Sequence, residues 1–282
     1  AVVAVKDYAG TFDTNAVTLV QNGSDKIGGS TDNAVLATEG TAVTLVFIDS
    51  TQGWLVTDSG LTSEAPTAAF VTATGGTITT SGNFKIHTFT GPGAFCVSNA
   101  GNAAGSNAVD YLIIAGGGGG ANNTSGGGGA GGYRESGGTV SGCYAVSPLG
   151  SSPSPVAAIP VTAQGYPIVV GAGGAGSQPK QGAAGSVSSG LGISSAGGGG
   201  GAANATSPGY CSPANGDGGS GGGGRGGGGI PGLGGNGNTP PVSPAQGFNG
   251  GSGGVGLSPD AAAGGGGGAT AVGATATAPA GG

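Results

Sequence analysis

Charged and chemically reactive side chains are scarce in this chain. Charged residues make up 6% of its 282 residues, methionine is absent, and His87 is the single histidine. Disordered chains are usually rich in charge, whereas this one combines little charge with a slightly positive mean hydropathy of +0.12. The composition therefore argues against a disordered chain. It also leaves few groups from which an acid–base or metal site could be built.

Positive charge is scarce as well, because six Lys and Arg stand against twelve Asp and Glu. Nucleic-acid binding needs clustered basic residues, and the six here are scattered. They are Lys6, Lys26, Lys85, Arg134, Lys180 and Arg225. No run of about 18 apolar residues is present either. We therefore expect no nucleic-acid partner and no membrane insertion.

The chain lacks the residue arrangements typical of catalysis. His87 stands without a second histidine or a Cys-x-x-Cys pair for a metal. Residues 171–176 fit the pattern G-x-G-x-x-G, but a dinucleotide site also needs a following helix and an acid about 20 residues on. The sequence has neither. We therefore expect no enzyme, no cofactor and no metal site. A hydrolytic surface enzyme is the weaker alternative, because no sequence motif marks a catalytic nucleophile.

Only three cysteines are present, at positions 96, 143 and 211. Cys143 and Cys211 both interrupt the glycine-rich region and both adjoin a tyrosine, as Cys143-Tyr144 and Tyr210-Cys211. A Cys143–Cys211 disulfide would close a long loop, which favours stabilisation in the usual entropic model. Three unpaired, partly buried thiols fit the sequence equally well. The odd count leaves one cysteine over in either case.

Glycine is abundant instead, with 73 residues, and the motif Ala-Gly-Gly-Gly-Gly-Gly-Ala occurs at Ala115–Ala121, Ala196–Ala202 and Ala263–Ala269. A glycine run loses much backbone entropy on ordering, so it orders only if its N–H and C=O groups find partners. Helices of the polyproline II kind, with three residues per turn, can pack side by side when side chains are absent. Apolar segments recur before the runs, so packed helices are favoured over a flexible spacer.

Short segments rich in Val, Leu, Ile and Thr, separated by turn-forming residues, predict β-strands. The predicted fold class is all-β, with a small N-terminal β module followed by strands interleaved with a packed polyglycine-II-like region. We expect a β module for trimerisation or attachment at 1–64, a β connector domain at 65–114 and a glycine-rich domain at 115–282. The predicted strands are Ala1–Val5, Ala16–Val20, Ala34–Ala37, Ala42–Ile48, Trp54–Val56, Thr77–Thr80, Phe84–Phe89, Ala94–Val97, Val109–Ile114, Tyr166–Val170 and Leu191–Ser195.

The stretch from Phe84-Lys-Ile-His-Thr-Phe-Thr-Gly-Pro-Gly-Ala-Phe through Val109-Asp-Tyr-Leu-Ile-Ile-Ala to Gly126-Gly-Gly-Gly-Ala-Gly-Gly-Tyr-Arg resembles a known glycine-rich domain. This domain belongs to tail-fibre and other appendage proteins of bacteriophages. Residues 1–64 are similar to a small β module of phage fibres and virion proteins, which is commonly trimeric. The resemblance implies packed polyglycine helices with recognition loops at one end, and it assigns no functional residue.

Large side chains are few in the glycine-rich region, which makes them candidates for surface binding. Aromatic rings beside an arginine can hold sugars or a protein surface. Packing between strands and glycine helices explains the same residues equally well. The candidates are Tyr133, Arg134, Tyr210 and Arg225.

The sequence thus predicts a non-enzymatic structural component of a phage virion fibre or appendage, extracellular and on the virion surface. We expect self-association as a homotrimer, contact with other virion fibre or baseplate proteins, and contact with a host surface glycan or protein. Several copies acting together would strengthen such binding. The alternative is a secreted microbial cell-surface filament or matrix subunit that polymerises.

Overall fold

The computed structural model describes residues 1–60, 68–102, 105–121, 124–137, 157–177, 181–203, 216–227, 232–255 and 261–277. In these ranges it contains strands β1 to β16 and no α-helix, so the all-β prediction is confirmed. The chain divides into two compact units, Ala1–Ala69 and Phe70–Gly282. The described strands of the expected connector domain belong to the second unit.

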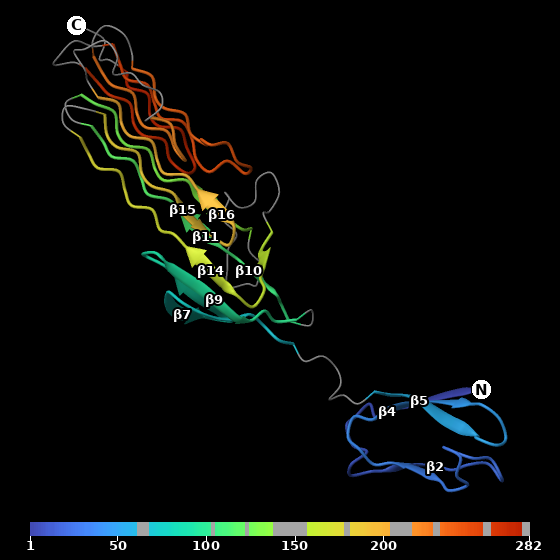
Figure 1. Ribbon diagram of the computed structural model, residues 1–282. Helices are drawn as coiled ribbons and strands as arrows, with labels where there is room; N and C mark the ends of the chain where they lie inside the picture. The colour runs from blue at the N-terminus through green and yellow to red at the C-terminus, as the bar shows by residue number, and fades with distance from the viewer. Residues whose placement is uncertain are drawn as a thin grey trace. The chain divides into compact units, whose positions relative to one another are not determined.

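The first unit contains a three-stranded antiparallel sheet with the order β1-β4-β5 and a two-stranded sheet β2-β3 (Figure 1). Alternation along the central strand β4 turns Val43 and Leu45 inward, and these are 7% and 4% exposed. The strands are β1 (Val2–Lys6), β2 (Val17–Leu19), β3 (Ala34–Leu36), β4 (Ala42–Phe47) and β5 (Trp54–Gly60).

The hydrophobic core of the first unit is thin. Val43 and Leu45 are the only buried hydrophobic side chains in its described part. Many others remain exposed, because a unit of this size has too little interior to cover them. The exposed large hydrophobic residues are Val2, Val3, Tyr8, Val20, Val35, Ile48 and Val56.

A buried carboxylate organises the turn that follows β1. Asp7 is 3% exposed, and its carboxylate accepts hydrogen bonds from the backbone N–H groups of Thr11 (3.0 Å), Phe12 (3.0 Å) and Gly40 (2.9 Å). Burial alone would raise the pKa of Asp7, but these N–H donors outweigh it and hold the pKa below its usual value.

The second unit begins with antiparallel strands around a small core of Ala73, Phe95, Val97 and Val161. The sheet β14-β9-β6 carries most of this core, and the remaining strands pair as β7-β8, β10-β13, β11-β12 and β15-β16. Their bounds are β6 (Thr72–Thr74), β7 (Thr77–Ser81), β8 (Phe84–Thr88), β9 (Gly93–Asn99), β10 (Ala108–Val109), β11 (Leu112–Ile114), β12 (Tyr133–Glu135), β13 (Ile159–Pro160), β14 (Gly165–Ile168), β15 (Ser188–Gly190) and β16 (Ile193–Ser195).

The second unit departs from the predicted strands at several places, and β12, β13 and β15 correspond to no predicted strand. The expected single strand Val109–Ile114 is split into β10 and β11, which pair with different partners. Strand β6 was not among the predicted strands. Leu191 was predicted to begin a strand, but it lies in the β15–β16 turn with φ 54°.

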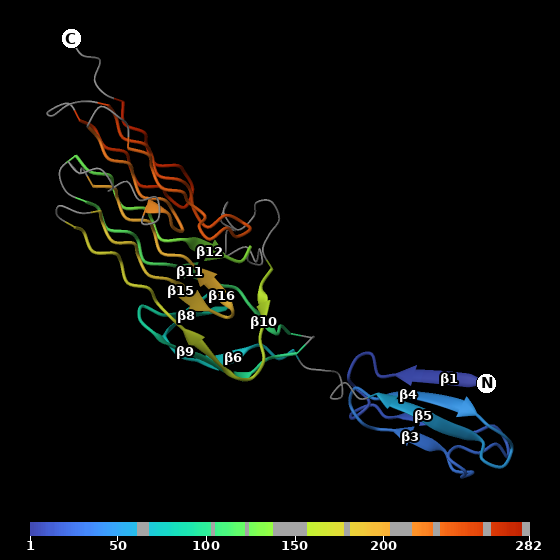
Figure 2. The same ribbon diagram turned by 45° about the horizontal axis from the view of Figure 1, so that its top comes forward.

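Beyond these strands, glycine-rich segments run side by side in an extended conformation (Figures 1 and 2). We call them the glycine array. Each segment is joined to its neighbours by backbone hydrogen bonds. The segments are 115–121, 124–132, 169–177, 181–187, 196–203, 216–227, 232–237, 246–255, 261–268 and 271–277.

Hydrogen bonds within the array repeat every three residues. In segment 216–227, the N–H groups of Gly221, Gly224 and Gly227 donate to the carbonyls of residues 248, 251 and 254. The N–H groups of residues 220, 223 and 226, one position earlier in each step, donate to the carbonyls of residues 130, 127 and 124. The first partner segment therefore runs parallel to 216–227, and the second runs antiparallel.

The same hydrogen bonds arrange the segments in two layers. The first layer has the lateral order 169–177, 115–121, 124–132, 261–268, 271–277. The second layer has the order 181–187, 196–203, 216–227, 246–255, and segment 232–237 lies across 216–227 and 246–255. Segment 216–227 bonds to five neighbours, which makes it the centre of the array.

The segments approach so closely that most glycines leave no room for a side chain. A Cβ at Gly126 would lie 1.8 Å from the carbonyl oxygen of Gly223, and one at Gly118 would lie 2.1 Å from that of Gly199. In the array, backbone packs directly on backbone. Glycine is required there by space, as side-chain complementarity is in an ordinary core.

The array has two distinct ends. At the strand end, β11, β14 and β16 lead directly into segments 115–121, 169–177 and 196–203. At the opposite end, which we call the far end, consecutive segments reverse direction, between residues 121 and 124, 177 and 181, 227 and 232, and 255 and 261. Bonds such as Gly226 N–H to Thr124 C=O and Gly254 N–H to Ala262 C=O join neighbouring segments close to this end.

Candidate functional site

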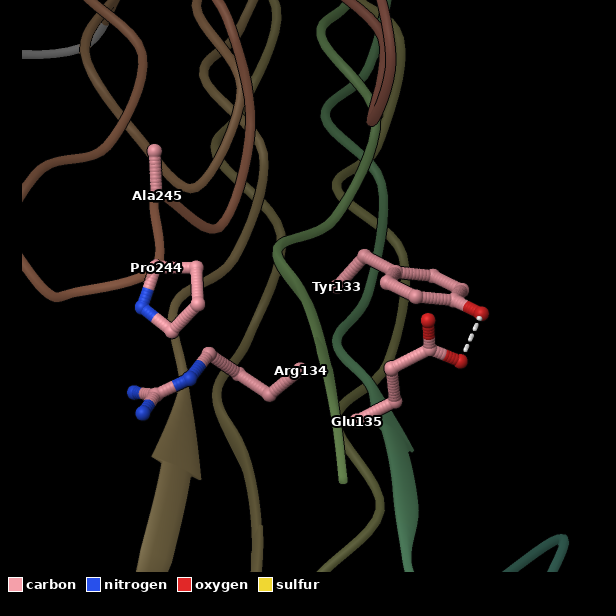
Figure 3. Close-up of a pocket in the computed structure, with 5 residues that line it drawn as sticks. All are labelled: Tyr133, Arg134, Glu135, Pro244 and Ala245. Carbon is pink, nitrogen blue, oxygen red and sulfur yellow. Dashed lines mark hydrogen bonds between the residues drawn. The ribbon is translucent and has the colours of Figure 1, made fainter. Parts of the chain in front are cut away.

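Strand β12 carries two of the predicted surface-binding residues, at the strand end of the array. Tyr133 and Glu135 lie on one side of the strand, because residues two apart share a face, and Arg134 points to the other side (Figure 3). The Tyr133 hydroxyl donates a 2.8 Å hydrogen bond to Glu135 Oε2. Arg134 Nη1 donates to the Ser194 carbonyl at 3.4 Å.

Glu135 is a second polar group of this site, and sequence analysis missed it. It is 8% exposed, and its Oε1 is buried without a hydrogen-bond partner. The adjoining cavity, lined by residues 133–135 with Pro244 and Ala245, has a volume of about 10 Å³, enough for about one water molecule (Figure 3). The spacing Tyr-x-Glu on a strand was the available signal, since it places both side chains together.

Arg134 also acts electrostatically on Tyr111, the residue before β11. Burial raises the pKa of the Tyr111 hydroxyl, and the positive charge of Arg134 partly offsets this rise. Arg134 thus contacts one hairpin through Ser194 and influences a second strand through its charge. Its side chain is half-buried, so it serves packing and surface chemistry together.

An open groove of about 230 Å³ lies between β14 and the β15–β16 hairpin. Tyr166 and Pro167 form one side, and Leu191 and Ile193 belong to the hairpin side. The Tyr166 ring also packs against Phe95 in the core, with centroids 6.5 Å apart. Hydrogen bonds from Gln164 and Thr162 lower the pKa of the Tyr166 hydroxyl. One side of the groove is therefore formed by a residue that also packs in the core.

Arg225 lies far from the β12 site. Because Ser220 bonds to Ala130, Arg225 stands about eight residues further along the array than Tyr133, or about 25 Å at a rise of about 3.1 Å per residue. Its guanidinium Nη1 donates to the Gly227 carbonyl at 3.3 Å, close to the far end. The structure therefore brings Tyr133 and Arg134 together and separates Arg225 from them.

The remaining predicted residues are distributed as follows. Tyr210, Cys143 and Cys211 lie outside the described residues, so the predicted disulfide stays a prediction. Cys96 is a free, exposed cysteine on β9. His87 makes a 2.8 Å hydrogen bond to the Gly75 carbonyl, and its ring packs edge-on against Phe95 at 5.1 Å. His87 therefore serves the fold of the strand region.

The described residues contain no group of three or more His, Cys, Asp or Glu side chains placed to hold a metal ion. In the same ranges, no helix has the length and apolar character needed to cross a bilayer. No family of known proteins matches the chain, and neither does any curated protein or solved structure.

Proposed function

We propose that this protein is a non-enzymatic structural component of a phage virion fibre or appendage. The host surface contacts it at the far end of the glycine array. The observation that carries the proposal is the gathering of four chain reversals at one end of an array held by backbone hydrogen bonds. Such an array is a rigid support for connecting loops, and loops on rigid scaffolds commonly carry recognition.

The array segments are helices of the polyglycine II type. A helix with three residues per turn presents successive N–H groups in three directions. The three-residue step of the donors in segment 216–227, alternating between two neighbours, supports this assignment. Cα–H···O contacts between segments add to it, because the carbonyls of Gly118 and Gly128 point at glycine Cα positions of adjoining segments.

The first unit attaches the protein to other virion fibre or baseplate proteins, or joins it to further copies as a homotrimer. Its thin core and its exposed residues Val2, Val35 and Ile48 support this role. Exposed apolar surface of this kind is costly in water and is covered when a partner docks.

Immunogold electron microscopy of the source sample, with antibodies against this chain, tests the proposal. Label is expected on virion tails, fibres or other appendages. Label on long free filaments without attached virions would replace the proposal with a polymerising microbial surface filament.

The position of the host contact is tested by two matched arginine variants. Arg225→Gln, near the far end, is expected to lower adsorption of the labelled protein to host cells about tenfold, the value of one charged hydrogen bond. Arg134→Gln, at the strand end, is expected to leave adsorption unchanged. Weaker adsorption of Arg134→Gln alone would place the host contact at β12. Unchanged adsorption of both variants would show that neither arginine takes part in the host contact.

A further inference from the structure

The two lateral edges of the first layer leave backbone groups without partners. The layer ends on one side at segment 169–177, where the carbonyls of Gly173 and Gly176 accept from no described residue. At the opposite edge, the N–H groups of Val272 and Thr275 donate to none of the described residues. One edge therefore offers free acceptors and the other offers free donors, each at a three-residue step.

These free groups would suit each other if one edge of a copy met the opposite edge of another copy. Segments 169–177 and 271–277 run in the same direction, because two antiparallel steps separate them along the layer. Parallel neighbours already bond within the array, where segment 169–177 donates to segment 115–121. The backbone groups alone would thus let copies add edge to edge without limit, as unpaired strand edges do in sheets.

Side chains obstruct this contact at the edge formed by segment 169–177. A helix with three residues per turn has three rows of residues. A Cβ on Gly174 would lie 2.0 Å from a carbonyl oxygen of the second layer, and one on Gly173 would lie nearest to a carbonyl oxygen of the first layer. The remaining row contains Ala172 and Ala175, which are both exposed. Their methyl groups therefore point away from the array, toward any added segment.

The opposite edge carries larger side chains beside its free donors. Val272 is 64% exposed, and Ala274 and Thr275 are exposed next to it. The row that faces the array contains glycine again, since a Cβ on Gly273 would lie 2.1 Å from the carbonyl oxygen of Gly265. Glycine thus occupies rows where segments meet, and side chains occupy the outward rows.

We propose that these exposed side chains keep the array from joining edge to edge with further copies of the chain. A Cβ at Gly118, which faces a neighbouring segment, would lie 2.1 Å from a carbonyl oxygen. The methyl groups of Ala172 and Ala175 would meet an added segment equally closely, and close-packed backbone has no room for them. This role does not depend on the proposed function, and it separates the chain from a filament that grows through the edges of its array.

The broad outer face of the first layer needs no such side chains in its two central segments. Segments 115–121 and 124–132 present N–H groups there but no outward carbonyls, so the same face of a second copy cannot accept them. Within the described part of the layer, free donors and free acceptors could therefore meet at the lateral edges.

Two variants of the full chain test the proposal. Ala172→Gly/Ala175→Gly opens the acceptor edge, and Val272→Gly/Ala274→Gly/Thr275→Gly opens the donor edge. Each variant alone keeps one closed edge and is expected to sediment with the mass of the unmodified protein. An equimolar mixture is expected to reach at least twice that mass, because it contains one open edge of each kind. An unchanged mass of the mixture, or association of either variant alone, would overturn the proposal.

Circular dichroism checks that each variant folds, and hydrogen exchange in the unmodified protein keeps the proposal testable if one does not. With closed edges, the amides of Val272 and Thr275 are expected to exchange freely at every protein concentration. The amide of Gly273 is expected to stay protected through its 2.8 Å bond to the Asn249 carbonyl. Protection of Val272 and Thr275 that grows with concentration would show that the edges meet in spite of their side chains, and the proposal would then be wrong.

Discussion

At the scale of single residues, the glycines of the array allow close packing because they lack a Cβ, whereas an ordinary core packs through complementary side chains. Gly223 is buried in the central segment, and a Cβ there would lie 2.1 Å from the carbonyl oxygen of Gly264. That carbonyl belongs to a segment fixed by its own bond from Gly264 N–H to Gly224 C=O, 2.9 Å long. We expect Gly223→Ala to destabilise the protein by about 1–3 kcal/mol or more. Thermal unfolding measures this effect.

Gly91→Ala is the control for that substitution, because a Cβ at Gly91 would meet nothing within 4 Å. Its effect should stay within about 0.5 kcal/mol. Equal melting temperatures for Gly223→Ala and Gly91→Ala would contradict the tight packing of the central segment.

Gln246 supplies side-chain hydrogen bonds at a place where the backbone-to-backbone hydrogen bonds of the array end. It is 1% exposed, its Oε1 accepts from Ala196 N–H at 2.8 Å, and its Nε2 donates to the Pro240 carbonyl at 2.8 Å. Gln246→Leu removes two hydrogen bonds, each worth about 0.5–1.5 kcal/mol, so we expect a loss of about 1–3 kcal/mol in the free energy of unfolding.

The matched control for Gln246→Leu is Gln181→Leu, since Gln181 is half-exposed and makes only one long bond of 3.4 Å, to the Gly200 carbonyl. A smaller shift of the denaturation midpoint is expected for it. Nothing in the sequence singles out Gln246, because its role depends on three segments meeting around it. The abundance of glycine predicted a packed glycine region, but the sequence could not predict that Gln246 is the side chain that bonds to the backbone at its edge.

At the scale of elements, the sequence predicted most strands and failed where pairing changed partners. The runs Ala42–Phe47 and Phe84–Thr88 are strands because β-branched and aromatic residues fill them between turn formers. Val109–Ile114 is equally apolar, yet it splits at Asp110-Tyr111, because β10 pairs with β13 whereas β11 pairs with β12. Ser188–Gly190 has no strand composition at all and pairs only because the Leu191-Gly192 turn folds it back on β16. The hydrogen bond between Tyr133 and Glu135 could be predicted only if residues 133–135 were known to form a strand, and their local composition did not indicate β12.

At the scale of the whole molecule, the two units should differ in their response to acid. A carboxylate whose pKa is lower in the folded than in the unfolded state stabilises folding above its unfolded pKa, and this contribution is lost as the pH falls through the folded pKa. Hydrogen bonds lower the pKa of Asp7, and those from Gln52 and Thr51 lower that of Asp49. Both residues belong to the first unit, which should lose stability below about pH 4.

Fluorescence of Trp54 follows this loss selectively, because Trp54 is the single tryptophan of the chain and lies in the first unit. The first unit is expected to unfold at a lower temperature at pH 3 than at pH 7, and Asp7→Asn should reduce the difference. A pH-independent Trp54 transition would show that neither carboxylate contributes to folding.

The three-residue repeat of the array also sets a rule for how the protein can change in length. Removing one residue from segment 216–227 would turn everything after it by a third of a turn and point its donors at the wrong neighbours. Removing or adding three residues would let each N–H group bond to the same neighbouring segment, shifted by one three-residue step. Segment lengths are therefore free to vary only in units of three, whereas the connections between segments face no such restriction. Evolution of this molecule is expected to proceed by whole turns in the array and by single residues at its ends.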